Sequence, residues 1–118
     1  GWLQKWGAAG TAESPYGREL MARTMESYHK KEYCALATHG YKLLAQAVGS
    51  YEDHPLPCPA LLLCGEKDTA GSCRRYDRAW AKATGLPLVW VPGAGHNANT
   101  DNPGFVNQQI RRFVELLP

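Results

Sequence analysis

The chain has 118 residues, a length that suits one domain, and its 44% hydrophobic and 20% charged residues are ordinary for a globular protein. Its formal net charge of +2 is too small to indicate a nucleic-acid partner or an acidic membrane surface. No apolar run approaches the roughly 18–20 residues of a membrane-spanning helix, and the N-terminal residues show no signal-peptide pattern, so we expect a cytoplasmic protein.

Four cysteines, Cys34, Cys58, Cys64 and Cys73, show neither C-x-x-C spacing nor zinc-finger spacing to a histidine. The sequence therefore predicts no metal site and no cofactor. Cys64 in an apolar strand and Cys34 on an apolar helix face are interpreted as small core residues. Cys73 has the setting of a reactive thiol, because the first turn of a helix and the adjacent Arg74 would lower its pKa. A structural thiol in a reducing cytoplasm is the alternative.

Two helices are predicted in residues 1–50. Residues 1–13 are interpreted as a short helix or loop. Ser14-Pro15 then has the pattern of a helix start, with serine as the N-cap and proline at the first helical position. Apolar residues continue at helical spacing as far as Tyr28, where a charged stretch interrupts them. The second helix closes at Gly49 and has one apolar face, formed by Tyr33, Leu36, Ala37, Gly40, Tyr41, Leu44, Ala47 and Val48.

Residues 51–118 show two short apolar runs, each followed by a helix. Residues 51–59 contain three prolines and form a loop, and residues 60–64 lack alternation, as in a strand buried on both faces. Ser72 can cap a helix that buries Tyr76, Ala79, Trp80 and Ala83 and stops at Gly85. Residues 88–91 form the second strand. Asn102-Pro103 begins the last helix, whose buried stripe is Val106, Ile110, Phe113, Val114 and Leu117, with Gln108, Gln109, Arg111, Arg112 and Glu115 in water.

The predicted order is helix, helix, strand, helix, strand, helix, which indicates an α/β fold with two parallel strands joined by a right-handed crossover. Two parallel strands do not make a stable sheet, because such sheets are normally wider and covered on both faces. The first strand would also leave an apolar edge unpaired. We therefore expect a missing N-terminal half, or a second copy in a homo-oligomer, to pair with that edge.

Each predicted strand is followed by a glycine turn and then by a group suited to acid–base chemistry. Residues 59–68 read P-A-L-L-L-C-G-E-K-D and end at Asp68, and residues 88–99 read L-V-W-V-P-G-A-G-H-N-A-N and contain His96. Gly93 and Gly95 would let the second loop turn sharply. Because parallel strands end at the same edge of a sheet, Asp68 and His96 should lie within side-chain reach of each other. If they act as a pair, an Asp68 oxygen should lie roughly 2.6–3.2 Å from a His96 ring nitrogen. Such a carboxylate holds the ring in one tautomer, as a histidine base requires.

Each motif has a simpler interpretation when it is taken alone. An aspartate in this position can have no role beyond capping the following turn, and a histidine in a glycine loop is usually solvated. His29, His39 and His54 lack a comparable setting and are interpreted as surface or core histidines. Of the remaining polar residues near the motifs, Glu66 and Lys67 are expected to face solvent. Asn97 and Asn99 are expected to shape the histidine loop, and contact with a substrate is the alternative.

Together with the stretch D-N-P-G-F-V-N-Q-Q-I-R-R-F-V (residues 101–114), the two motifs closely resemble the C-terminal part of the α/β-hydrolase fold. In that family the penultimate strand ends in G-x-x-D with the acid of the catalytic triad, and a glycine-rich turn after the last strand carries the triad histidine. Gly65, Asp68, Gly95 and His96 match this pattern. The resemblance is specific over residues 57–117. It implies that residues 1–50 hold part of a helical cap and a connecting helix, and that residues 51–118 are the C-terminal segment of the hydrolase core.

The resemblance implies an esterase-like hydrolase of small-molecule substrates, in which Asp68 orients His96 and His96 is the general base and acid. The family's G-x-S-x-G elbow and oxyanion-hole loop are absent, since Gly49-Ser50 follows a helix and Gly71-Ser72 precedes one. We therefore expect the nucleophile on a segment outside these residues and no activity in this chain alone. Two alternatives are a non-catalytic, hydrolase-like binding or receptor module that self-associates through its sheet edge, and thiol chemistry at Cys73.

Overall fold

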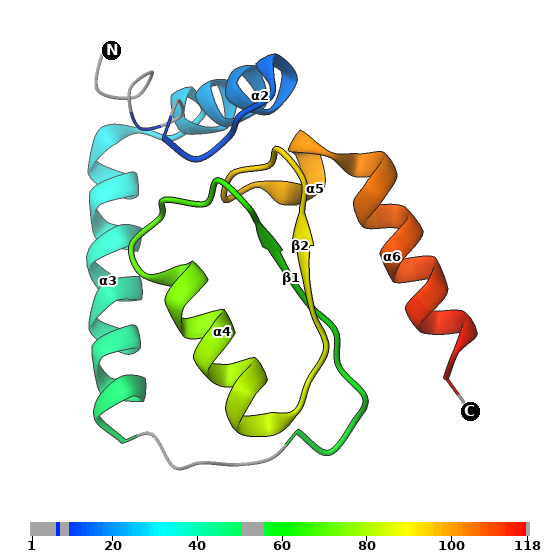
Figure 1. Cartoon of the computed structure of the whole chain (residues 1–118). Helices are drawn as coiled ribbons and strands as arrows, with labels where there is room; N and C mark the ends of the chain where they lie inside the picture. Colours follow the sequence, from blue (N-terminus) through cyan, green and yellow to red (C-terminus); the bar gives the residue numbers. More distant parts are fainter. Residues whose placement is uncertain (1–6, 8–9, 51–55, 118) are drawn as a thin grey trace.

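The computed structural model describes residues 7, 10–50 and 56–117 and places the elements in the predicted order (Figure 1). The elements are α2 (Pro15–Glu26), α3 (Lys30–Gly49), β1 (Leu62–Gly65), α4 (Cys73–Thr84), β2 (Leu88–Val91), α5 (Ala98–Asp101) and α6 (Pro103–Glu115). The predicted mixed α/β architecture with two parallel strands is thus confirmed. The single turn α5 was not predicted, because four residues are too few to show a helical period. The interpretations of His54 and of most of residues 1–13 concern residues outside the described ones.

β1 and β2 form a parallel pair in which Leu62 lies opposite Leu88 and Gly65 opposite Val91. The Leu62 N–H donates to the Pro87 carbonyl at 2.9 Å. β1 begins two residues later than predicted, because the first residue of β2 that pairs with it is Leu88, directly after Pro87. Within the described part of the chain the sheet has these two strands alone, so no strand borders the other edge of β1.

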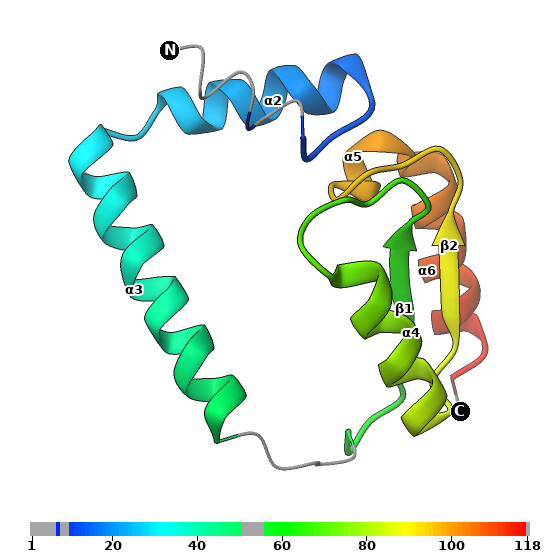
Figure 2. The same ribbon diagram turned by 60° about the vertical axis from the view of Figure 1, so that its left-hand side comes forward.

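Helices lie on both faces of this small sheet, with α4 on one face and α6 on the other (Figure 2). The core lies on the α6 side, where Val91, Ala94 and Val106 are buried together. Their partly buried neighbours are Leu63, Ala98 and Phe105. On the other face, the half-buried residues of α4 are Cys73, Arg74, Asp77 and Ala81.

The predicted inward faces of α4 and α6 are largely wrong. In α4, Tyr76 is 63% exposed and Trp80 is 40% exposed, and Ala79 and Ala83 are exposed as well. In α6 the stripe is covered only at Val106 and Phe113; Gln109 is half-buried, whereas the exposed residues are Ile110, Val114 and Leu117. Two short strands offer too little surface to cover the apolar face of either helix.

α3 is exposed along its length except at Ala37, and Figure 2 shows it standing away from the sheet. The interpretation of Cys34 as a core residue is therefore wrong, since this thiol is exposed. Within the described part of the chain, most of the apolar face of this 20-residue helix is exposed. Among the helices of the described residues, none is long and apolar enough to cross a membrane.

The helix ends follow the predicted capping chemistry with two exceptions. The Ser14 hydroxyl accepts the Gly17 N–H at 2.9 Å, and the Asn102 side chain accepts the Phe105 N–H at 3.3 Å. Gly85 ends α4 in the left-handed region, with φ of +72°. Ser72 occupies the N-cap position of α4 but makes no side-chain capping bond. α3 continues through its predicted terminal glycine, Gly49, to a C-cap at Ser50; α2 ends at Glu26, before Tyr28.

Candidate active site

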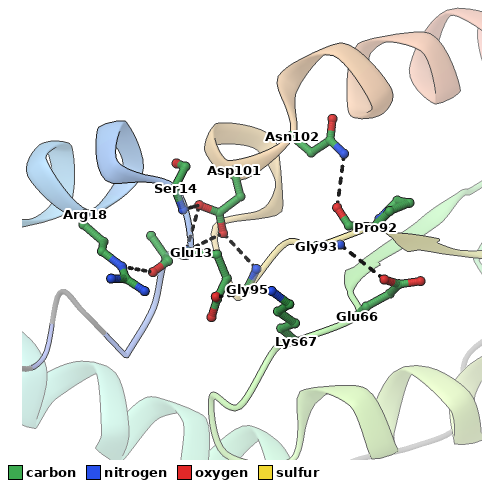
Figure 3. A network of polar contacts seen from close by, with 11 residues as sticks. Glu13, Ser14, Arg18, Glu66, Lys67, Pro92, Gly93, Gly95, Asp101 and Asn102 are labelled. Carbon is green, nitrogen blue, oxygen red and sulfur yellow. Dashed lines mark hydrogen bonds and ion pairs between the residues drawn. The ribbon is translucent and has the colours of Figure 1, made fainter.

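Two loops meet at the carboxyl end of the sheet and are bonded to each other. The Lys67 N–H donates to the Ala94 carbonyl at 2.9 Å. The Gly93 N–H donates to the Glu66 carboxylate at 3.2 Å (Figure 3). Gly93 turns the second loop with φ of +69°. The backbones cross so closely that a Cβ on Gly65 would collide with the carbonyl oxygens of Ala94 and Gly95. This crossing holds the loop that carries Asp68 against the loop that carries His96.

Asp68 and His96 meet across these loops. Asp68 Oδ2 lies 3.0 Å from His96 Nδ1, within the predicted range of distances. The Asp68 side chain is 5% exposed and the His96 side chain is 46% exposed. With a proton on Nδ1 donated to the carboxylate, Nε2 keeps its lone pair and can act as a base. The predicted distance is confirmed, and the catalytic role of the pair stays a prediction.

Asp68 also satisfies the simpler interpretation of its position. Its other oxygen, Oδ1, accepts the Ala70 N–H at 2.8 Å, which is an aspartate capping its own turn. The turn fixes the carboxylate in one orientation and directs Oδ2 at the imidazole. Asp68 can therefore cap its turn through Oδ1 and orient His96 through Oδ2 at the same time.

A second carboxylate, Asp101 of α5, anchors the histidine loop from behind. It accepts the N–H of Gly95 at 2.8 Å, of Ser14 at 2.8 Å and of Glu13 at 2.9 Å (Figure 3). Desolvation raises the pKa of Asp101, but the hydrogen bonds from Ser14, Glu13 and Gly95 outweigh it and hold the pKa below its usual value. The sequence prediction missed this residue, because an aspartate beside Asn102-Pro103 looks like part of an ordinary helix start.

The other polar residues of the two loops have structural surroundings. Asn97 donates from both its backbone N–H and its side chain to the Thr11 carbonyl, at 2.9 and 2.8 Å, which fits its predicted role in shaping the loop. Glu66 and Lys67 are exposed as predicted. Lys67 Nζ lies 3.8 Å from a Glu13 carboxylate oxygen. Three more residues named in the sequence analysis, His29, His39 and Asn99, are exposed.

Cys73, the first residue of α4, lies close to the pair. One donor atom each from Asp68, Cys73 and His96 falls within 4.8 Å of the others. Burial raises the pKa of the Cys73 thiol, and the charges of Asp68 and Asp77 raise it further. The predicted lowering of this pKa is therefore wrong, because burial and the two carboxylates outweigh the backbone hydrogen bond that lowers it.

Cys64 in β1 is a core thiol, as predicted. It is 3% exposed. Burial, followed by a hydrogen bond with Asp77, raises its pKa to about 12. The thiol is therefore protonated near neutral pH and suited to packing rather than to nucleophilic chemistry.

A hollow of about 320 Å³ lies beside Asp68 and is lined mainly by the start of α4, with Gly71, Ser72, Arg74, Arg75 and Arg78. A larger hollow, of about 440 Å³, is lined by Tyr28 and residues of α3 and includes neither Asp68 nor His96.

Comparison with protein-family models, with curated proteins and with solved structures found no match for this chain.

Proposed function

We propose that Asp68 and His96 are the orienting acid and the general base of an esterase-like hydrolase of small molecules with the α/β-hydrolase fold. The observation that carries the proposal is the 3.0 Å contact between Asp68 Oδ2 and His96 Nδ1 at the ends of two adjacent parallel strands. A buried carboxylate on one ring nitrogen and a half-exposed ring on the other side are what such a base requires.

In this proposal His96 Nε2 takes the proton of a serine hydroxyl as that oxygen attacks the ester carbonyl. The Asp68 carboxylate stabilises the imidazolium that forms, and Nε2 then gives the proton to the departing alcohol. The serine and the donors of the oxyanion hole come from a segment outside these 118 residues. Residues 1–50 are then part of the cap with its connecting helix, and residues 51–118 are the C-terminal segment of the core.

Two features support a further segment beside this chain. In the described residues, no strand borders the second edge of β1, a position that proteins normally pair or cover. Large apolar side chains on α3, α4 and α6 are also exposed.

The four cysteines are all free, which agrees with a reducing compartment such as the cytoplasm.

Hydrolysis of p-nitrophenyl acetate tests the proposal. The chain alone should hydrolyse this ester no faster than its Asp68→Ala and His96→Ala variants, because it lacks a nucleophile. A longer protein that includes the coding region upstream of Gly1 should be active, and His96→Ala in that protein should reduce kcat by about 10⁶-fold. Activity of the chain alone above its variants would contradict an external nucleophile. Full activity of the longer His96→Ala protein would contradict the role of His96.

A second candidate function, a non-catalytic module that self-associates through its sheet edge, is favoured by the same open edge of β1. A second copy could continue the sheet without any nucleophile. The exposed face of α3 would then also be available to a partner. The size of the chain in solution separates a self-associating module from a chain that awaits a different segment.

A further inference from the structure

Three donor groups of different chemistry converge at the carboxyl end of the sheet. A carboxylate comes from the loop after β1, a thiol from the first residue of α4 and an imidazole from the loop after β2. We propose that Asp68, Cys73 and His96 bind a zinc ion, with a fourth coordination position open to water. This proposal requires only these three side chains, and it holds or fails independently of the hydrolase.

The donor set is one that zinc uses in proteins. Zinc accepts thiolate, imidazole and carboxylate ligands, and three protein ligands with one open position are typical of reactive zinc sites. A thiolate with an imidazole also favours zinc over magnesium or calcium, which prefer oxygen ligands. The Asp68–Cys73–His96 set therefore points to a soft or borderline divalent cation.

The spacing needs only a small adjustment. Ligand bonds of about 2.0–2.3 Å in a tetrahedron place donor atoms roughly 3.3–3.8 Å apart. The three donors lie within 4.8 Å of one another, and the Asp68 oxygen and His96 nitrogen are 3.0 Å apart. Cys73 follows a turn at Gly71 with φ of +55° and an N-cap without a side-chain bond, so the approach of its sulfur breaks no capping interaction.

The surrounding charges favour a cation at the thiol. Burial and the carboxylates of Asp68 and Asp77 all disfavour a bare thiolate at Cys73. A divalent ion reverses that effect, because a coordinated thiol loses its proton. The three arginines that line the hollow beside Asp68 each lie over an aromatic ring: Arg74 and Arg78 are 5.8 and 4.8 Å from the centre of the Trp90 ring, and Arg75 is 5.3 Å from that of Tyr76.

Binding is balanced by the release of one proton. Cys73 gives its S–H proton to solvent, and the neutral His96 ring binds through Nδ1 with its own proton moved to Nε2. Zinc therefore takes the atoms that the proposed acid–base pair would use. In a hydrolase of the proposed kind, a bound zinc ion would inhibit the reaction.

The test uses the untagged chain with Cys34→Ser and Cys58→Ser, which remove two exposed thiols outside the cluster. Cobalt(II) serves as the spectroscopic probe. We expect one equivalent to produce a sulfur-to-cobalt charge-transfer band that one equivalent of zinc abolishes. Zinc affinity is measured by competition with a chromophoric chelator, and far-UV circular dichroism checks the fold of every variant.

Adding Cys73→Ser should remove the charge-transfer band, and Cys73→Ser and His96→Ala should each weaken zinc binding by more than about tenfold. His39→Ala, at an exposed position of α3, is the matched control and should bind zinc as the parent does. A parent without the band would overturn the proposal. Equal zinc affinity in the parent, Cys73→Ser and His96→Ala chains would overturn it as well.

Discussion

At the scale of single residues, the carboxylates of Asp68 and Asp101 both help to position His96. Asp68 Oδ2 contacts the imidazole directly, and Asp101 accepts the N–H of Gly95, the residue before it. Asp101 also accepts two N–H groups from the segment that leads into α2. The position of the imidazole thus depends on a contact that joins the N-terminal part of the chain to the sheet end.

We expect Asp101→Asn to lower the free energy of unfolding by about 1–3 kcal/mol at pH 7, because an amide replaces a carboxylate that accepts several N–H bonds. The pKa of Asp101 is lowered in the folded state from an ordinary value of 3.8. Its contribution is therefore fully present above pH 3.8 and is lost as the pH falls through the lower, folded-state pKa. Urea denaturation of both proteins between pH 7 and pH 2 measures the difference, which should shrink in acid.

The matched control is Glu19→Gln on the exposed face of α2, where the carboxylate lies 3.8 Å from Arg23. Such a surface pair contributes at most about 1 kcal/mol. A difference between wild type and Asp101→Asn that stayed constant with pH would show that the carboxylate charge is not what stabilises the loop.

At the scale of elements, the site depends on how closely the loop after β1 approaches the loop after β2. The Glu66 N–H donates to the Val91 carbonyl at 3.1 Å, so the pairing continues past the end of β1 into the loop. Gly65 lies at this crossing, where the carbonyls of Ala94 and Gly95 leave no room for a Cβ. The requirement for glycine comes from this close approach, since Gly65 does not have a positive φ.

Gly65→Ala should therefore separate the two loops and lower the free energy of unfolding by about 1–3 kcal/mol, a usual cost of overpacking. Nitrogen-15 NMR of the His96 ring supplies a second measurement. Wild type should hold the tautomer with the proton on Nδ1, and Gly65→Ala should shift the ring toward the other tautomer. Gly40→Ala is the control, because Gly40 lies within α3 with open space around its missing Cβ.

In the control, alanine should leave the tautomer unchanged and stabilise α3 by up to about 1 kcal/mol. A Gly65→Ala protein with wild-type stability and a wild-type His96 tautomer would refute the role given to the crossing.

At the scale of the whole molecule, the described helices carry more apolar surface than the two described strands can cover. Trp80 of α4, Ile110 of α6 and Leu44 of α3 are each at least 40% exposed. One edge of β1 is also without a strand in the described structure. Both features indicate that the surface which completes this fold lies on another segment or on a second copy.

If the chain is the self-associating module, the isolated chain should form a dimer through the open edge of β1. In a parallel pair alternate N–H groups point to the same neighbour; Leu62 donates toward β2, so the N–H of Leu63 points to the open edge. Replacing Leu63 by its α-hydroxy acid keeps the side chain and removes only this donor. Sedimentation should then show a dimer dissociation constant at least about tenfold weaker.

The same exchange at Leu88 is the control, because by the same alternation its N–H points away from β1 and the dimer should persist. A monomeric wild-type chain would contradict self-association. A dimer unaffected by the change at Leu63 would place the interface elsewhere.

Much of the element order followed from local patterns. Ser14-Pro15 and Asn102-Pro103 start helices because their capping groups act within one turn, and Gly85 ends α4 for an equally local reason. The orientation of the helices could not be predicted in this way. A stripe that contains Trp80 or Ile110 shows which face is apolar, but whether that face is buried depends on elements far away in the sequence.

Asp68 and His96 could be paired from the sequence because each follows an apolar strand and a glycine turn, and parallel strands end at one edge. Cys73 and Asp101 carried no comparable signal. The neighbours of Cys73, Asp68 and His96, come from two separate loops, and the carboxylate of Asp101 accepts N–H groups from near residue 14 as well as from Gly95. Caps, turns and periodicity act over a few residues and can therefore be predicted from the sequence. A thiol's pKa and a zinc site depend on which charges come together in space, and only the folded arrangement decides that.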